Sequence, residues 1–261
     1  MRELAEALEF QLLKHDRVVF AERLLPSLDD WQRELLESNP KRALLACARQ
    51  VGKSTVCAIV ALHRALYFPG SLVLAVSPTL RQSAELTSKV NAFYRGLGKP
   101  VPAETERKLS LELSNGSRII TLPGDAVPGD ADNVRGFSAP SLVLLDEAAF
   151  VPDEMYFALK PMMSVSSGAL YLLSSPHGRA GAFYEEWENG GDAWERYRIT
   201  AAECPRISEE YLASEKAALP WWIFQQEYMA EFTETQDSLF RYEDVMKSIR
   251  SDVTPLFPED E

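Results

Sequence analysis

Apolar runs alternate with longer amphipathic segments along most of this sequence. Short runs that are apolar throughout are typical of strands buried on both faces of a sheet. We predict such strands at 42–47, 71–78, 141–150 and 168–178, and a weaker one at 194–200. Apolar residues at helical spacing predict helices at 53–67, 80–98, 208–220 and 221–232. Residues 1 to about 40 also have a helical pattern, with Asp29 and Asp30 as candidates for the start of a short helix over 31–38.

Two further patterns lie in the middle of the chain. Apolar and polar residues alternate over 108–124, which predicts a β-hairpin that turns at Asn115-Gly116. Residues 123–140 are dense in Gly, Pro and Asp, and they show no helical or strand period. A segment of that length inside a compact domain is usually functional or without fixed structure.

Strands that alternate with helices predict an α/β fold, in which a mostly parallel sheet is covered by helices on both faces. Ligands of such sheets bind at the carboxyl ends of the strands. We divide the chain into an N-terminal helical segment (1–40), a core (41–205) and a helical C-terminal extension that ends in an acidic tail (206–261).

Composition narrows the function classes. The chain has 27 Lys and Arg against 39 Asp and Glu, a formal net charge of -12, which argues against a surface that is basic throughout. A local basic patch stays possible, and six cations in the segment 81–108 are candidate DNA contacts or simply part of a mixed solvated surface: Arg81, Lys89, Arg95, Lys99, Arg107 and Lys108. Three widely spaced cysteines and the lack of a membrane-length apolar run predict a soluble protein of a reducing compartment.

The segment "CARQVGKST" (47–55) resembles a phosphate-binding loop, G-x-x-x-x-G-K-[ST], in which Cys47 replaces the first glycine. Such a loop aims backbone N–H groups and a helix N-terminus at phosphates, its lysine reaches the β- and γ-phosphates, and its hydroxyl holds Mg²⁺. The alternative is a chance Gly-Lys-Ser at the start of a helix. The nucleotide-binding residues we predict here are Arg49, Gln50, Val51, Gly52, Lys53, Ser54 and Thr55.

A second signal is the acid pair that ends the apolar run "LVLLDE" (142–147). Carboxylates at the end of a buried strand are costly unless a metal or hydrogen bonds receive them. Asp146 suits the magnesium shell of a nucleotide site, together with Ser54, and Glu147 suits the base that polarises an attacking water. A helix cap is the alternative for Glu147. Together the loop and the acids predict hydrolysis of a nucleotide with Mg²⁺.

These motifs resemble those of the large terminase subunits, the ATP-driven motors that package DNA in tailed bacteriophages. The resemblance rests on "ARQVGKS" (48–54), "DNVRG" (132–136), "LVLLDEAA" (142–149), "SSPHG" (174–178) and "FQQEYMAEF" (224–232). Loops of this family commonly lack the first glycine, so the loop is interpreted as specialised. The resemblance implies a P-loop NTPase of the ASCE type, whose catalytic glutamate follows the magnesium aspartate.

The resemblance also implies partners and a place of action. It implies double-stranded viral DNA, a small terminase subunit and a homo-oligomeric ring on the portal of the procapsid, all in the cytoplasm of the host bacterium and without a membrane. Large terminases normally continue into a nuclease domain, and the sequence given stops about thirty residues after the last matching motif. We therefore expect a motor domain without nuclease activity.

Four further residues are candidates for the site. A glutamine amide matches the donor and acceptor edge of adenine, so Gln32 is predicted to contact the base, with an exposed helical glutamine as the alternative. Arg135, beside a glycine in the segment 123–140, is a candidate arginine finger, with a solvated loop arginine as the alternative. The resemblance favours the finger, and Arg49 competes for the role. The resemblance also implies that Ser174 and Ser175 couple the γ-phosphate to DNA movement, although a plain turn after a strand would show the same residues.

Two other functions fit parts of the pattern. A helicase-like or DNA-remodelling ATPase would need further motifs in a second motor domain, and none follows in this sequence. A nucleotide-gated assembly module without productive turnover would have no need of Glu147 as a base.

Overall fold

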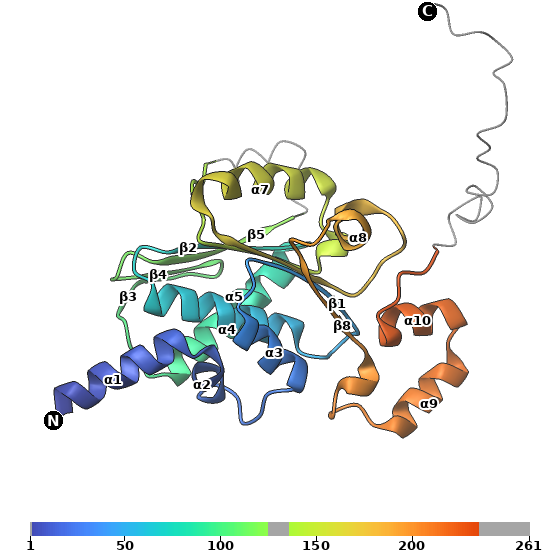
Figure 1. Ribbon diagram of the computed structural model, residues 1–261, viewed down its shortest axis with the longest axis horizontal. Coiled ribbons are helices and arrows are strands. Elements are labelled where there is room, and N and C mark those ends of the chain that lie inside the picture. The colour runs from blue at the N-terminus through green and yellow to red at the C-terminus, as the bar shows by residue number, and fades with distance from the viewer. Residues whose placement is uncertain (1, 125–135, 235–261) are drawn as a thin grey trace, which may run out of the picture.

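The computed structural model describes residues 2–124 and 136–234, and its centre is an eight-stranded sheet (Figure 1). The strand order is β3-β4-β5-β2-β6-β7-β1-β8. The six strands from β5 to β8 in this order run parallel, and β4 is antiparallel to both of its neighbours. The strands are β1 (Arg42–Cys47), β2 (Leu72–Ser77), β3 (Ala103–Glu106), β4 (Ser110–Leu113), β5 (Arg118–Pro123), β6 (Leu142–Asp146), β7 (Ala169–Ser174) and β8 (Glu195–Ile199).

Helices cover both faces of the sheet (Figure 1). On one face lie α1 (Arg2–His15), α2 (Arg17–Glu22), α3 (Asp30–Ser38), α4 (Lys53–Tyr67) and α5 (Leu80–Gly96), and on the other lie α7 (Asp153–Ser166) and α8 (Gly181–Asn189). Two 3-10 turns, η1 (Ala148–Phe150) and η2 (Ala201–Glu203), follow β6 and β8. The last helices, α9 (Glu209–Ala218) and α10 (Trp221–Met229), pack on each other and on η2. None of the described helices combines the length and the apolar character needed to cross a membrane.

The apolar runs predicted as buried strands do supply both layers of the core. In β1, Ala43, Leu45 and Cys47 belong to the core on the α4 side, whereas Leu44 and Ala46 belong to the core on the α7 side. Successive side chains of a strand point to opposite faces, so a strand in the middle of a covered sheet must be apolar at every position. The predicted fold class, an α/β protein with a mostly parallel sheet, is confirmed.

The predicted hairpin over 108–124 is also confirmed. β4 and β5 are antiparallel, and the turn between them contains Gly116 at φ 80° and is closed by a hydrogen bond from Leu113 N to Ser117 O of 2.9 Å. The short helix predicted near residue 31 begins after Asp29, which is its N-cap.

The structure differs from the sequence-based elements at several points. β3 falls in a segment for which no strand was predicted. α7 and α8, which connect β6 to β7 and β7 to β8, fall in segments for which no helix was predicted. The strand predicted over 141–150 ends at Asp146, because Glu147 adopts the left-handed conformation (φ 55°, ψ 47°) and the chain then forms η1.

Candidate nucleotide site

The predicted motifs converge at the carboxyl ends of three neighbouring strands. β6, β7 and β1 are adjacent in the sheet, and each is followed by one motif: the acid pair, the two serines and the glycine-rich loop. Parallel neighbours end at the same edge of a sheet, which brings together residues that lie more than 90 positions apart in the chain.

The loop after β1 lies between a strand and the N-terminus of a helix, as the predicted phosphate loop requires, although its first glycine is missing. Cys47 is the last residue of β1, and its side chain is fully buried in the core, where burial raises the pKa of the thiol to about 12. Gly52 caps α4 in the left-handed region at φ 100°, a conformation that only glycine adopts without strain. Backbone N–H groups of Thr55 and Val56 donate to Gly52 O at 3.1 and 3.2 Å, so α4 begins directly at the loop.

Lys53 is buried, and its ammonium group contacts three groups around the loop. Its Nζ donates to Ala48 O at 3.3 Å and to Ser175 Oγ at 3.1 Å, and it lies 3.5 Å from Glu147 Oε1. These contacts hold the ammonium group between the loop and the acid pair. A phosphate in the loop would meet a charge that is already in place.

Ser54 and Asp146 form the second part of the site. Ser54 Oγ donates to Asp146 Oδ2 at 2.8 Å, and Asp146 is only 4% exposed. The other carboxylate oxygen, Oδ1, is buried and has no hydrogen-bond partner among the described residues. Burial, and secondly the charge of Glu147, raise the pKa of Asp146. Hydroxyl and carboxylate oxygens are ligands that Mg²⁺ prefers, so Ser54 and Asp146 fit this ion. A bound Mg²⁺ would also be a partner for the Asp146 oxygen that has none.

Glu147 stands beside Lys53 because of its backbone. The left-handed conformation of a non-glycine residue is uncommon and clusters at functional sites. Its Oε2 accepts from Ser174 Oγ at 3.5 Å, and Ser174 Oγ accepts from Ala149 N at 3.1 Å. The side chain is 26% exposed, so water reaches it, whereas Asp146 is buried. The two adjacent acids are therefore in different environments.

Both predicted serines lie in the site. Ser175 contacts Lys53, and Ser174 contacts Glu147. The structure thus places each serine against one of the two groups that a γ-phosphate would approach. Their coupling role stays a prediction.

Arg49 contacts the C-terminal helix α10. Its guanidinium forms an ion pair with Glu227 of α10, and its backbone N–H donates to Glu227 O at 3.0 Å. A cleft of about 590 Å³ opens beside this contact, and residues of the loop, α9 and α10 line it, among them Gln50, Tyr211 and Tyr228. Arg135, the other predicted finger, lies outside the described residues.

Gln32 is buried next to the loop. Its amide oxygen accepts from Asp29 N at 3.1 Å, as part of the capping box of α3. Its amide nitrogen lies over Gly52, since a Cβ on that glycine would come within 2.8 Å of Nε2. The predicted contact with adenine is therefore not tested by these bonds, but the residue does border the nucleotide site.

Two contacts that fix the loop were not predicted from the sequence. Arg206 donates to both carboxylate oxygens of Asp29 at 2.7 Å and to Val51 O at 3.2 Å, and so links α3, the loop and the chain after η2. Glu227, the partner of Arg49, is the second. Arg206 lies in none of the quoted motifs, and Glu227 lies in the motif 224–232 without a predicted role, because both contacts span 150 residues or more of sequence.

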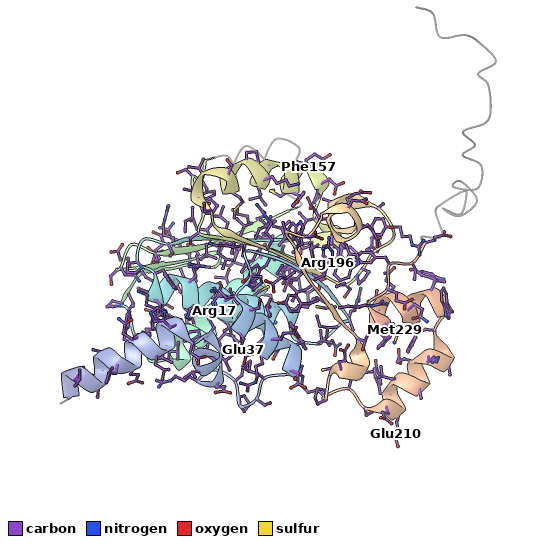
Figure 2. All side chains as sticks on the ribbon, viewed as in Figure 1. Arg17, Glu37, Phe157, Arg196, Glu210 and Met229 are labelled. Atoms are coloured by element: carbon purple, nitrogen blue, oxygen red, sulfur yellow. The ribbon has the colours of Figure 1, made fainter. Side chains whose placement is uncertain are left out.

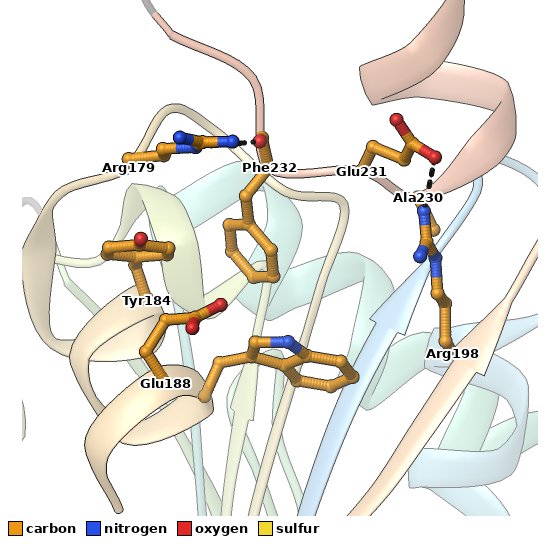
Figure 3. Close-up of a pocket in the computed structure, with 8 residues that line it drawn as sticks. Arg179, Tyr184, Glu188, Arg198, Ala230, Glu231 and Phe232 are labelled. Carbon is orange, nitrogen blue, oxygen red and sulfur yellow. Dashed lines mark hydrogen bonds and ion pairs between the residues drawn. The ribbon is translucent and has the colours of Figure 1, made fainter. Parts of the chain in front are cut away.

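The segment that leaves α10 is also held in place. Figure 3 shows Phe232 beside Tyr184 of α8, at a cavity of about 430 Å³. The ring centroid of Phe232 lies 5.2 Å from that of Tyr184 and 5.7 Å from that of Trp187, also of α8. Arg179 Nε donates to Phe232 O at 3.2 Å, and Arg198 of β8 pairs with Glu231 at 2.8 Å. The end of the described chain is thus anchored on α8 and β8.

The candidate DNA contacts are partly used within the protein. Arg95 Nη2 lies 2.8 Å from Glu106 Oε2, and Lys99 pairs with the other oxygen of the same carboxylate. Arg81, Arg107 and Lys108 are exposed. A DNA-binding face stays a prediction.

Comparisons with known proteins point to one family. A family model described as "Terminase large subunit, T4likevirus-type, N-terminal" matches residues 44–247. The large terminase subunits of Thermus virus P23-45 and Thermus phage G20c are 26% and 25% identical, and each alignment covers 80% of this chain and 49% of the relative. The chain therefore spans about half the length of the curated relatives it matches.

Solved structures are similar in fold. The large terminase ATPase domain of Thermus phage P74-26 superposes with a TM-score of 0.72 at 24% identity, covering 84% of this chain and 99% of that one. The large terminase of bacteriophage HK97 gives a TM-score of 0.68 at 16% identity, covering 84% of this chain and 55% of that one.

Proposed function

Because the chain belongs to the terminase large-subunit family, we propose that it hydrolyses ATP to drive viral double-stranded DNA into a procapsid. The observation that carries the proposal is the contact of Lys53 with both Glu147 and Ser175, next to the pair formed by Ser54 and Asp146. Three groups lie there within hydrogen-bonding or ion-pairing distance. They are a cation for the phosphates, oxygens for Mg²⁺ and a carboxylate that water can reach.

Binding uses the loop and the start of α4. Backbone N–H groups of the loop and the positive end of the helix receive the phosphates. Lys53 exchanges its contacts with Ala48, Ser175 and Glu147 for phosphate oxygens. Ser54 and Asp146 would hold Mg²⁺, which supplies positive charge against the negative charge that builds up during phosphoryl transfer.

Hydrolysis then falls to Glu147. Once Lys53 has turned to the phosphates, Glu147 is free to accept a proton from a water molecule in line with the γ-phosphate. The water oxygen bonds to phosphorus as the bond to the bridging oxygen of ADP breaks. Ser174 keeps the carboxylate oriented through Oε2, and its own oxygen is fixed by Ala149 N.

An arginine completes the charge stabilisation, and we propose Arg135 of a neighbouring subunit for this role, with Arg49 as its competitor in cis. A finger in trans requires a ring of subunits, which we propose to assemble on the portal of the procapsid with a small terminase subunit in the host cytoplasm. Gln32 and the cleft beside Gln50 border the position proposed for the base.

A mixing experiment tests the proposal. Lys53→Ala should abolish ATP turnover, whereas Lys216→Ala, on an exposed face of α9, should not. Mixing Lys53→Ala with Arg135→Ala should restore part of the turnover, since some interfaces then contain one intact loop and one intact arginine. Normal turnover in Lys53→Ala would refute the nucleotide site. No recovery in mixtures that form oligomers would refute the finger in trans and favour Arg49.

A further inference from the structure

A second polar cavity lies at the opposite end of β1 and α4 from the nucleotide site. It has a volume of about 290 Å³ and is lined by residues at the ends of α1, α3 and α4 and at the starts of α2, β1 and β7. α4 has 15 residues, so at 1.5 Å per residue the two sites are about 20 Å apart. Four cations line it against one acid among its described residues: Lys14, Arg17, Lys41 and Arg64 against Glu37.

Arg17 is the centre of this basic cavity. It is 5% exposed, and the hydrogen bond of its guanidinium is a long one, from Nη1 to Tyr171 OH at 3.4 Å. In the part of the chain that the structure describes, no carboxylate forms an ion pair with it. Figure 2 labels Arg17 and Glu37 in the helical layer below the sheet. A buried guanidinium without a counter-charge is strongly unfavourable.

Arg64 adds a second guanidinium of the same kind. It stacks on Phe68 at 4.7 Å, and its Nε is buried without a hydrogen-bond partner. Burial, and secondly the charge of Arg17, lower the pKa of Arg64, which shows that the two cations disfavour each other. Lys14 Nζ lies 5.5 Å from the same ring. Like charges are thus gathered around one partly open cavity in a chain that is acidic overall.

Helix-end carbonyls account for only part of this charge. α1, α3 and α4 end near the cavity, and cations near the carbonyl end of a helix are favourable. Lys41 Nζ donates at 3.0 Å to the carbonyl of Ser167, which caps the end of α7. The hydrogen bond of the Arg17 guanidinium, however, goes to a tyrosine hydroxyl and not to a carbonyl. The most deeply buried cation therefore needs another partner.

We propose that this basic cavity binds a small phosphate anion, inorganic phosphate or pyrophosphate. Guanidinium groups donate in a planar fork that matches phosphate oxygens. A water molecule takes about 30 Å³ of liquid, so a cavity of about 290 Å³ holds phosphate or pyrophosphate with some water. The burial of Arg17 favours a free anion over the backbone of a duplex, whose phosphates reach only exposed cations.

The test titrates the full chain carrying Lys53→Ala with phosphate and with pyrophosphate by calorimetry, so that binding at the nucleotide loop is weakened. Adding Arg17→Gln should reduce the remaining affinity at least about tenfold, as expected for the loss of one charge-assisted partner. Adding Arg95→Gln instead changes the net charge equally, at an exposed cation paired with Glu106, and should leave the affinity unchanged. Equal losses, or none with Arg17→Gln, would overturn the proposal.

Thermal unfolding separates this role from a structural one. In phosphate-free buffer Arg17→Gln should unfold at the same temperature as its parent or higher, and phosphate should raise the unfolding temperature of the parent alone. A lower unfolding temperature at every phosphate concentration would assign Arg17 to packing and overturn the proposal. If Arg17→Gln does not fold, the exposed Lys41→Ala carries the test, and unchanged phosphate affinity would refute the site. A short DNA duplex should not displace phosphate from the Lys53→Ala chain. If it does, and Arg17→Gln abolishes this competition, the cavity binds DNA and the proposal is overturned.

Discussion

Asp146 should lower the stability of the free protein, although its charge is needed for the proposed binding of Mg²⁺. The side chain is 4% exposed, its Oδ1 has no partner among the described residues, and burial raises its pKa. A buried polar group without a partner costs about 1–3 kcal/mol. Asp146→Asn keeps the shape and still places a polar atom there, but it removes the charge. Without ATP and Mg²⁺ it should therefore raise the free energy of unfolding by the charged part of that cost, about 1.4 kcal/mol for each unit by which the pKa of Asp146 is raised.

The pH dependence of this effect has a definite sign. Because the pKa of Asp146 is raised in the folded state, the native protein holds this proton more tightly than the unfolded chain does. Native stability is therefore lost as pH rises from the ordinary Asp value through the raised one. The advantage of Asp146→Asn should be present at pH 7 and should shrink in acid, where the wild-type carboxyl is protonated.

Urea unfolding of the free protein measures this directly. In a domain of this size, 1 kcal/mol corresponds to about 2–4 °C in unfolding temperature, so a thermal scan also resolves the effect. Asp192→Asn, at an exposed turn residue, is the matched control and should change stability by less than about 0.5 kcal/mol. MgATP should stabilise the wild type and not Asp146→Asn. A variant that is clearly less stable than wild type at pH 7 without ligands would refute the reasoning.

Two further substitutions test other contacts. Burial, and then the charge of Arg17, lower the pKa of His63 to about 3. As pH drops, the unfolded chain therefore takes up this proton before the folded one does, and the free energy of unfolding should fall by up to about 1.4 kcal/mol per pH unit between pH 6.5 and 3. His63→Gln should make this pH dependence weaker in urea unfolding. An unchanged dependence would contradict the role of His63. If Arg49 must leave Glu227 to reach ATP, Glu227→Gln should tighten ATP binding by up to about fivefold, the worth of an exposed ion pair. An equilibrium ATP titration with the same affinity as wild type would show that the pair does not compete with the nucleotide.

The central sheet was predictable because its strands are simple in pattern. Leu44 and Leu45 point into different layers of the core, so burial on both faces forces a continuous apolar run. α7 gave no such signal, because Phe157 and Val165 are exposed at 58% and 82% and blur the helical period. Pro161 inside the helix further weakens the pattern.

Part of the candidate site could likewise be predicted from the sequence, and part could not. Lys53, Ser54 and Asp146 lie in motifs whose spacing reflects the local geometry of a loop and a strand end, and the structure brings them together. The pairs Arg206–Asp29 and Arg49–Glu227 depend on how α3 and α10 pack against the loop. No local pattern records that packing, so these contacts could not be predicted from the sequence alone.

The most direct test of the account is single-turnover hydrolysis of ATP by Glu147→Gln. The substitution leaves Lys53, Ser54 and Asp146 in place and removes only the proton acceptor, whose side chain is 26% exposed beside Lys53. The account predicts ATP affinity close to wild type and hydrolysis slower by roughly 10² or more. Hydrolysis within a few-fold of the wild-type rate would contradict it, because the base would then lie elsewhere.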